Sequence, residues 1–150
     1  MAGRVPPKGF SPFIDLLGLS FGRCENGQAE CSLQVRAELL NSQRILHGGV
    51  AYAVADSGMG LALYSFVGDD ERVATMEVQI VYFKAVTSGS LTCNARVLHR
   101  SKRLGTVEAE LTNDGRLVAK ALGTFSISKR KKVADSTGRQ PPLDGSGAGD

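Results

Sequence analysis

The residue best suited to chemistry in this 150-residue sequence is Asp56, a carboxylate within a stretch of small and apolar residues from Gly48 to Phe66. If that stretch is helical, the neighbours of Asp56 four positions away are Tyr52 and Gly60, so no cation of the same helix can pair with it. A carboxylate in such surroundings is expected to have a raised pKa, which would prepare it to act as a general base or a nucleophile. The residues alone leave open a structural role in which Asp56 caps a neighbouring loop.

The tripeptide His47-Gly48-Gly49 opens this stretch. The first turn of a helix has N–H groups without helical partners and carries partial positive charge, and glycine lets a ligand approach the backbone closely. Such N–H groups would stabilise the oxyanion that forms during hydrolysis of a thioester. Gly49, together with Gly48, is therefore a candidate oxyanion donor. His47 is more simply interpreted as a residue that orders the turn.

The spacing between Gly49 and Asp56 adds a constraint. The two residues are seven positions apart, which corresponds to roughly 10 Å along a helix. One carbonyl group cannot readily contact both residues of the same helix. Two helices that run antiparallel about a two-fold axis would bring Gly49 of one chain near Asp56 of the other. We therefore expect a homodimer with its active sites at the interface.

The rest of the pattern predicts the elements that would position these residues. The stretch from Gly48 to Phe66 has the length and composition of one buried helix, and the turn at Asn26-Gly27 predicts a hairpin before it. After Arg72 apolar and polar residues alternate, which predicts four further strands in an antiparallel meander. Strict alternation places Thr75 on the face opposite to Tyr82. A sheet of this kind would wrap around the helix in an α+β fold.

Composition places the chain among ordinary globular proteins, with 42% hydrophobic and 22% charged residues and a net charge of +3. We predict a flexible N-terminus at residues 1–11, one domain at residues 12–128, and a disordered basic tail rich in Gly and Pro at residues 129–150. We expect no membrane span, no signal peptide and no basic face for nucleic acid. The three cysteines fit no disulfide framework or metal spacing, which favours a cytoplasmic protein without a metal site.

The segment that carries these residues resembles the hotdog-fold acyl-CoA thioesterases of the phenylacetate-degradation (PaaI-like) type. Their pattern is an Asn, a His-Gly-Gly six residues later, and an Asp nine residues after the His. This sequence has Asn41, His47-Gly48-Gly49 and Asp56 at those spacings. A strand that opens with Thr75, followed by three similar strands, extends the resemblance over residues 12–128.

The resemblance implies a hotdog fold, with five to six antiparallel strands around one long central helix, and a role for each matching residue. Asp56 would activate water or attack the thioester carbonyl directly, and the N–H of Gly49, perhaps with that of Gly48, would bind the oxyanion. Of the other matching residues, Asn41 would orient water or the thioester, His47 would order the loop, and Thr75 would help to position the water. In the family these groups come from two subunits. No cofactor is implied, because coenzyme A is part of the substrate.

Coenzyme A carries phosphates, which Arg and Lys side chains bind well. Arg100, Lys102 and Arg103 cluster at a predicted turn between two strands and are candidates for this role. An equally good interpretation is a solvated hairpin tip. Arg44 departs from the family pattern, since many members have Gly there. The expected assembly is a homo-oligomer, with a tetramer of two dimers favoured.

Two other functions on the same fold are alternatives to thioester hydrolysis. A non-catalytic acyl-CoA-binding sensor would be expected to lack the carboxylate and to carry a DNA-binding helix pair, and this chain keeps Asp56 and has no room for that pair. A hydratase or dehydratase would need a catalytic His near a carboxylate on the helix, and no His lies between Gly48 and Leu98. The acyl group itself cannot be read from the sequence.

Overall fold

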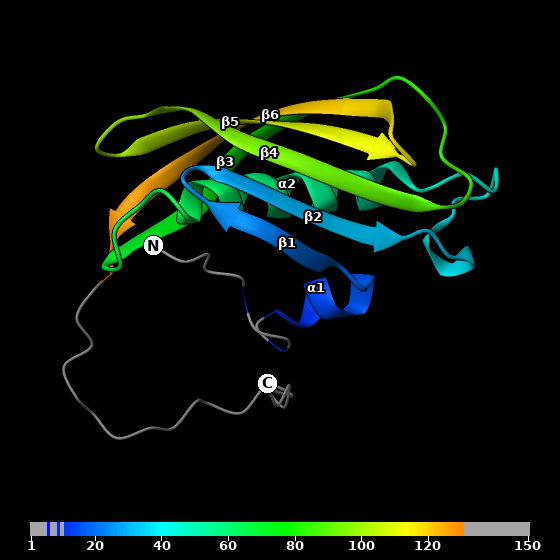
Figure 1. The fold of residues 1–150 in the computed structure, drawn as a ribbon, viewed down its shortest axis with the longest axis horizontal. Coiled ribbons are helices and arrows are strands. Elements are labelled where there is room, and N and C mark those ends of the chain that lie inside the picture. Colours follow the sequence, from blue (N-terminus) through cyan, green and yellow to red (C-terminus); the bar gives the residue numbers. More distant parts are fainter. Residues whose placement is uncertain (1–5, 7–8, 10, 131–150) are drawn as a thin grey trace, which may run out of the picture.

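The stretch around Asp56 forms the long helix α2 (Gly48–Tyr64), which lies against one face of a six-stranded antiparallel sheet (Figure 1). This arrangement comes from a computed structural model, which describes residues 6, 9 and 11–130. The helix begins at Gly48 as predicted and ends slightly before the predicted residue, Phe66. The predicted hotdog architecture, with five to six strands around one long helix, is confirmed.

The sheet is built from six strands separated mostly by short turns. In chain order they are β1 (Ser20–Glu25), β2 (Gln28–Gln34), β3 (Glu71–Tyr82), β4 (Ser90–Arg100), β5 (Leu104–Asn113) and β6 (Arg116–Lys129). Two short helical pieces are α1 (Pro12–Leu17) and the 3-10 helix η1 (Ala37–Leu39). The predicted hairpin between β1 and β2 is confirmed, with Asn26 at φ 50° and Gly27 at φ 75° in its turn. Two positive φ angles in a two-residue turn match the twist of the flanking strands.

The predicted meander of four successive strands is wrong for its first strand. The order in the sheet is β1-β2-β4-β5-β6-β3, so β3 pairs with β6 and lies at an edge (Figure 1). Tight turns at residues 101–103 and 114–115 make β4-β5 and β5-β6 into hairpins. Residues 83–89 form a longer connection, which does not force β3 and β4 to be neighbours. Alternation identifies a strand but does not name its partner.

The core lies between α2 and the inner face of the sheet. Its fully buried residues include Val54, Met59 and Leu63 from the helix and Leu91 and Phe125 from the strands. Helix and sheet approach closely at Gly58, where a Cβ atom would lie 2.7 Å from the Sγ atom of Cys93 and 3.2 Å from that of Cys31. A glycine in mid-helix is therefore required by this close approach.

All three cysteines are free thiols buried in this core. Cys31 and Cys93 are direct cross-strand partners of β2 and β4. The hydrogen bond with Cys93 and burial hold the pKa of the Cys31 thiol well above its ordinary value. The three thiols therefore pack as small apolar side chains, and the raised pKa of Cys31 makes its thiol a poor nucleophile.

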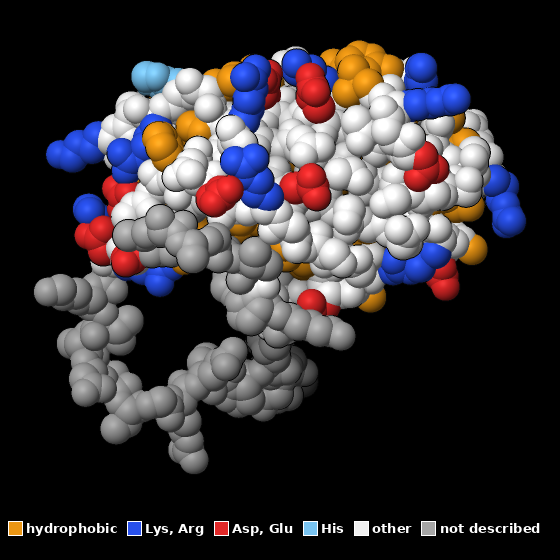
Figure 2. Space-filling view, viewed as in Figure 1, with side chains coloured by type: hydrophobic (Ala, Val, Ile, Leu, Met, Phe, Trp, Pro, Cys, Tyr) orange, Lys and Arg blue, Asp and Glu red, His pale blue; other side chains and the backbone are white. Residues whose placement is uncertain are grey.

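The outer face of the sheet carries acidic and basic side chains that alternate in sign (Figure 2). Ion pairs join Arg96 to Glu108 and Lys120 to both Glu108 and Glu110 across β4, β5 and β6. None of the helices in residues 6, 9 and 11–130 combines the length and hydropathy that a membrane crossing requires.

The last strand runs one residue past the predicted end of the domain, because β6 continues through Lys129. The ammonium group of Lys129 bonds to the Asp70 carboxylate at 2.7 Å, so this first residue of the predicted basic tail pairs within the chain. The rest of that tail from residue 131, and most of the predicted flexible N-terminus, lie outside the described residues.

Candidate active site

Asp56 lies half-buried on α2 and accepts a hydrogen bond from a strand. The hydroxyl Oγ1 of Thr75, on β3, donates to Oδ1 of Asp56 at 2.8 Å. Within the part of the chain that the structure describes, no loop N–H donates to this carboxylate, so the loop-capping interpretation loses its support. The structure thus brings together two of the residues that the sequence singled out.

A β-bulge in β3 is what turns Thr75 towards the helix. Thr75 pairs with Phe125 and Glu77 pairs with Thr124, so Met76 is an extra residue between them. Paired residues of neighbouring strands point to the same face, and Phe125 is buried in the core. The prediction from strict alternation, which put Thr75 opposite to Tyr82, is therefore wrong: both point inward. Bulges often re-aim a side chain next to an active site.

The His47-Gly48-Gly49 turn begins α2 with an ordered cap. His47 is the N-cap residue, and its ring atom Nδ1 accepts a hydrogen bond from the Gly49 N–H at 2.9 Å. The carbonyl of His47 also accepts from the Val50 N–H at 2.9 Å. His47 thus orders the turn, as expected. A substrate oxygen that uses the Gly49 N–H must displace or share the bond to His47.

Asn41 holds the loop that leads into this turn. Its side-chain oxygen accepts from the N–H groups of Gln43 at 2.9 Å and Ile45 at 3.3 Å. Arg44, the departure from the family pattern, has φ 64°. That left-handed conformation favours glycine and costs other residues roughly 1 kcal/mol. The Asn41 hydrogen bonds offset this cost, so the loop keeps its shape without the glycine.

Tyr82 is a residue of this region that sequence reasoning missed. Its hydroxyl donates to the carbonyl oxygen of Gly48 at 2.7 Å. Burial, and then the neighbouring Tyr52, raise the pKa of Tyr82, so its hydroxyl remains a proton donor at neutral pH. The sequence feature that could have indicated this role is a tyrosine at the end of a predicted strand, on the face that points to the helix. It was not usable because the bulge and the sheet order were unknown.

An open, mostly apolar hollow of about 290 Å³ adjoins the start of α2. Asn41, Gly48 and Tyr82 lie on its wall together with Lys84. The apolar part of the wall comprises Ile45, Leu46, Ala51, Phe83, Ala85, Val86, Leu91, Val118 and Ala119. A hollow of this kind beside backbone N–H donors can hold an apolar group whose polar end faces the helix N-terminus.

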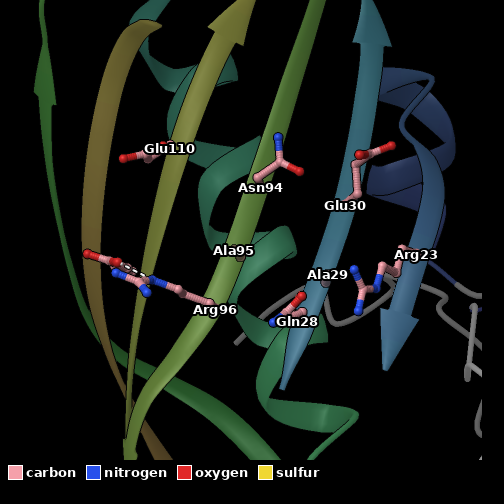
Figure 3. Close-up of a pocket in the computed structure, with 9 residues that line it drawn as sticks. Arg23, Gln28, Ala29, Glu30, Asn94, Ala95, Arg96 and Glu110 are labelled. Atoms are coloured by element: carbon pink, nitrogen blue, oxygen red, sulfur yellow. Dashed lines mark hydrogen bonds and ion pairs between the residues drawn. The ribbon is translucent and has the colours of Figure 1, made fainter. Parts of the chain in front are cut away.

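A second hollow, of about 420 Å³, lies on the outer face of the sheet (Figure 3). Its wall includes Arg23, Glu30, Asn94 and Arg96, whose strand neighbours Ala29 and Ala95 point into the core. Figure 3 shows α2 behind these strands, so this hollow is separated from Asp56 by the sheet. It takes no part in the candidate site.

The three predicted phosphate-binding cations do not behave alike. The guanidinium Nη2 of Arg100 bonds to Oε2 of Glu71 at 2.7 Å, and Glu71 also accepts from the Gly68 N–H at 2.8 Å. The guanidinium of Arg100 is therefore already paired with the carboxylate of Glu71, a largely buried residue that is 9% exposed. Lys102 and Arg103 are exposed at the β4-β5 turn. Of the three, these two are free to contact a ligand.

One chain therefore holds two partial sites. Asp56 and Thr75 form the first, and Gly49 with its supporting residues forms the second. The two are separated along α2 by seven residues, the difference between positions 49 and 56, which is roughly 10 Å along the helix axis.

The fold is that of a hotdog thioesterase, and sequence comparison agrees. The model of the thioesterase superfamily matches residues 43–120. The chain belongs to this superfamily and is a thioester hydrolase.

Named relatives lie within the same group. A conserved protein of Pseudomonas aeruginosa of known structure is 38% identical, with a TM-score of 0.78 over 82% of this chain and 100% of the other. A variant of the phenylacetic acid degradation protein PaaI from Thermus thermophilus is 29% identical, with a TM-score of 0.72 over 77% and 98%. The acyl-coenzyme A thioesterase PaaI of Escherichia coli is 26% identical over 65% of this chain and 68% of its own length.

Proposed function

We propose that this protein hydrolyses acyl-coenzyme A thioesters at sites shared by two copies of the chain. The observation that carries the proposal is the Asp56 carboxylate, half-buried and held by the Thr75 hydroxyl at 2.8 Å. The similarity to PaaI of Escherichia coli, whose name states an acyl-coenzyme A thioesterase, supports coenzyme A as the leaving group.

In the reaction, Asp56 takes a proton from a water molecule whose oxygen attacks the thioester carbonyl carbon. The carbonyl oxygen becomes an oxyanion, which the Gly49 N–H stabilises from the start of the second helix. The C–S bond then breaks, the leaving thiolate takes up the proton that Asp56 holds and departs as coenzyme A, and the acid is released. Direct attack by Asp56, with a mixed anhydride that water then hydrolyses, uses the same groups. In both routes Thr75 fixes the carboxylate and Asn41 orients the water or the thioester.

The free edge of the sheet supports a two-chain site. Strand β3 is twelve residues long, lies at the edge and exposes Met76 and Val81 at 63% and 54%. A long, exposed apolar edge strand favours pairing with another strand. If β3 pairs antiparallel with β3 of a second copy, the two α2 helices also run antiparallel. Asp56 of one chain then approaches Gly49 of the other.

The proposed substrate contacts follow from the same arrangement. The apolar hollow beside Gly48 receives part of the acyl thioester, and the exposed Lys102 and Arg103 bind phosphates of coenzyme A. Pairing of two dimers into a tetramer, and a cytoplasmic location, remain predictions from the sequence.

The test is the rate of thiol release from a panel of aromatic, short-chain and long-chain acyl-CoA thioesters. For Asp56→Asn we expect kcat to fall at least about 100-fold for the best substrate, because a general base contributes that much or more. Asp15→Asn, an exposed carboxylate on α1, is the matched control and should retain wild-type rates. Equal rates for wild type and Asp56→Asn would overturn the catalytic role. Binding of acyl-CoA without turnover by the wild type would instead favour the sensor.

A further inference from the structure

The Gly48–Gly49 peptide group is held at both of its polar ends. Its carbonyl oxygen, on Gly48, accepts a hydrogen bond from Tyr82 Oη at 2.7 Å. Its N–H, on Gly49, donates to Nδ1 of His47 at 2.9 Å. A peptide group is planar and almost always trans, so the direction of its carbonyl fixes the direction of its N–H. Whatever holds the Gly48 carbonyl therefore aims the Gly49 N–H.

Two adjacent glycines need such a support. Glycine has a wider range of backbone conformations than any other residue, so a Gly-Gly pair in the first turn of a helix is poorly fixed by its own sequence. The His47 bond cannot supply the support during catalysis, because the substrate oxygen competes for the same N–H. The Tyr82 bond lies on the opposite edge of the peptide and survives substrate binding.

The packing of Tyr82 explains why position 48 is a glycine. A Cβ atom at residue 48 would lie 3.3 Å from both Cζ and Oη of Tyr82, which is closer than side chains normally pack. Tyr82 itself is anchored in the sheet, since it pairs with Ala119 and the next N–H, of Phe83, donates to the Val118 carbonyl at 2.7 Å. The hydrogen bond from Tyr82 thus joins a strand fixed in the sheet to the glycine turn at the start of α2.

We propose that Tyr82 is the positioning residue of the oxyanion hole: its hydroxyl clamps the Gly48 carbonyl and so orients the Gly49 N–H towards the developing oxyanion. This inference rests on the proposed function, in which that N–H is the oxyanion donor. The clamp also strengthens the donor, because a hydrogen bond to the carbonyl polarises the N–H of the same peptide. Tyr82 acts through the peptide and transfers no proton to or from the substrate.

The experiment measures kcat and KM of the full-length protein for its best acyl-CoA thioester, in Tyr82→Phe and in Tyr64→Phe. The first change keeps the ring and removes the hydroxyl; the second removes a hydroxyl at the far end of α2 and serves as the matched control. For Tyr82→Phe we expect kcat to fall about 5- to 30-fold with KM within about twofold, since the lost interaction acts mainly in the transition state. Tyr64→Phe should retain wild-type kcat.

A double-mutant cycle separates positioning from general damage. Gly49→Pro removes the N–H group that, in this proposal, Tyr82 orients. Proline is tolerated in the first turn of a helix. In that background Tyr82→Phe should change the residual kcat by less than about twofold. An undiminished loss there, an unchanged kcat in Tyr82→Phe alone, or a loss confined to KM would each overturn the proposal.

Asp56→Asn, assayed in parallel, keeps the two claims distinct. If Asp56→Asn is inactive and Tyr82→Phe is fully active, the proposed function stands and the clamp is wrong. If Asp56→Asn is fully active, the proposed function fails, whatever Tyr82→Phe does.

Discussion

At the scale of single residues, the main feature of the candidate site is that neighbouring side chains hold its key groups in place by hydrogen bonds. Asp56 is bonded by Thr75, and the Gly48–Gly49 peptide is bonded by Tyr82 and His47. Each group of α2 that we propose to take part in the reaction thus has a partner that fixes its direction. Such partners reduce the rearrangement needed during reaction, in which the Gly49 N–H exchanges His47 for the substrate oxygen.

Glu71, at the start of strand β3, contributes to the stability of the fold and has no part in the proposed reaction. The Gly68 N–H, and then Arg100, hold the pKa of Glu71 below its ordinary value of 4.5. A carboxyl whose pKa is lowered by folding stabilises the protein above its unfolded pKa and loses this effect as the pH falls through its folded pKa. Glu71 therefore contributes stability at neutral pH that is lost on acidification below pH 4.5.

We expect Glu71→Gln to unfold at a lower urea concentration than wild type at pH 7, with the difference narrowing at pH 3. Urea denaturation followed by circular dichroism at both values measures it. A difference that is the same at pH 7 and pH 3 would show that the charge of Glu71 is not what stabilises the fold.

At the scale of elements, the bulge at Met76 determines the site. Because Met76 has no partner on β6, Thr75 and Tyr82 pair with residues that are an even number of positions apart, Phe125 and Ala119. Both side chains therefore face α2. One strand thereby supports both partial sites, with the helix providing the reactive group at each.

This bulge predicts that two single-residue deletions in β3 differ in effect. Deleting Met76 removes the unpaired residue and leaves Thr75 opposite Phe125 and Tyr82 opposite Ala119, so folding and activity should be retained within about tenfold. Deleting Gln79 also shortens the strand by one residue, and the bulge can then close only if Glu77 turns towards the core and Val78 turns towards solvent. This inversion should lower the free energy of unfolding by about 2 kcal/mol or more. Thermal unfolding and thiol-release assays compare the two. Similar losses in both would contradict the bulge.

The elements and the wrapping of the sheet around α2 were largely predictable, and the position of β3 in the strand order was not. Alternation and turn residues identified every strand, and the apolar stretch identified α2. The pairing of β3 with β6 could not be predicted, because the longer connection at residues 83–89 permits several neighbours. Family spacing identified Asn41, His47, Gly49, Asp56 and Thr75. Tyr82 escaped because its contact joins residues 34 positions apart through the fold.

At the scale of the whole molecule, one chain is an incomplete enzyme in this account. Its base and its oxyanion donor lie apart on one helix, and the strand beside them is a free edge of the sheet. A two-fold axis through that edge would complete two equivalent sites at once, because isologous contacts occur in pairs. Assembly through β3 would therefore be a condition for catalysis.

The most direct measurement is activity in mixed dimers of two variants that are each expected to lose most of their activity, Asp56→Asn and Gly49→Pro. The two chains are co-expressed with different affinity tags, and the mixed dimers are purified through both tags. Each mixed dimer holds one intact site and one doubly altered site, so we expect thiol release at about half the wild-type rate per dimer. Activity no higher than that of either variant alone would contradict a site shared between two chains.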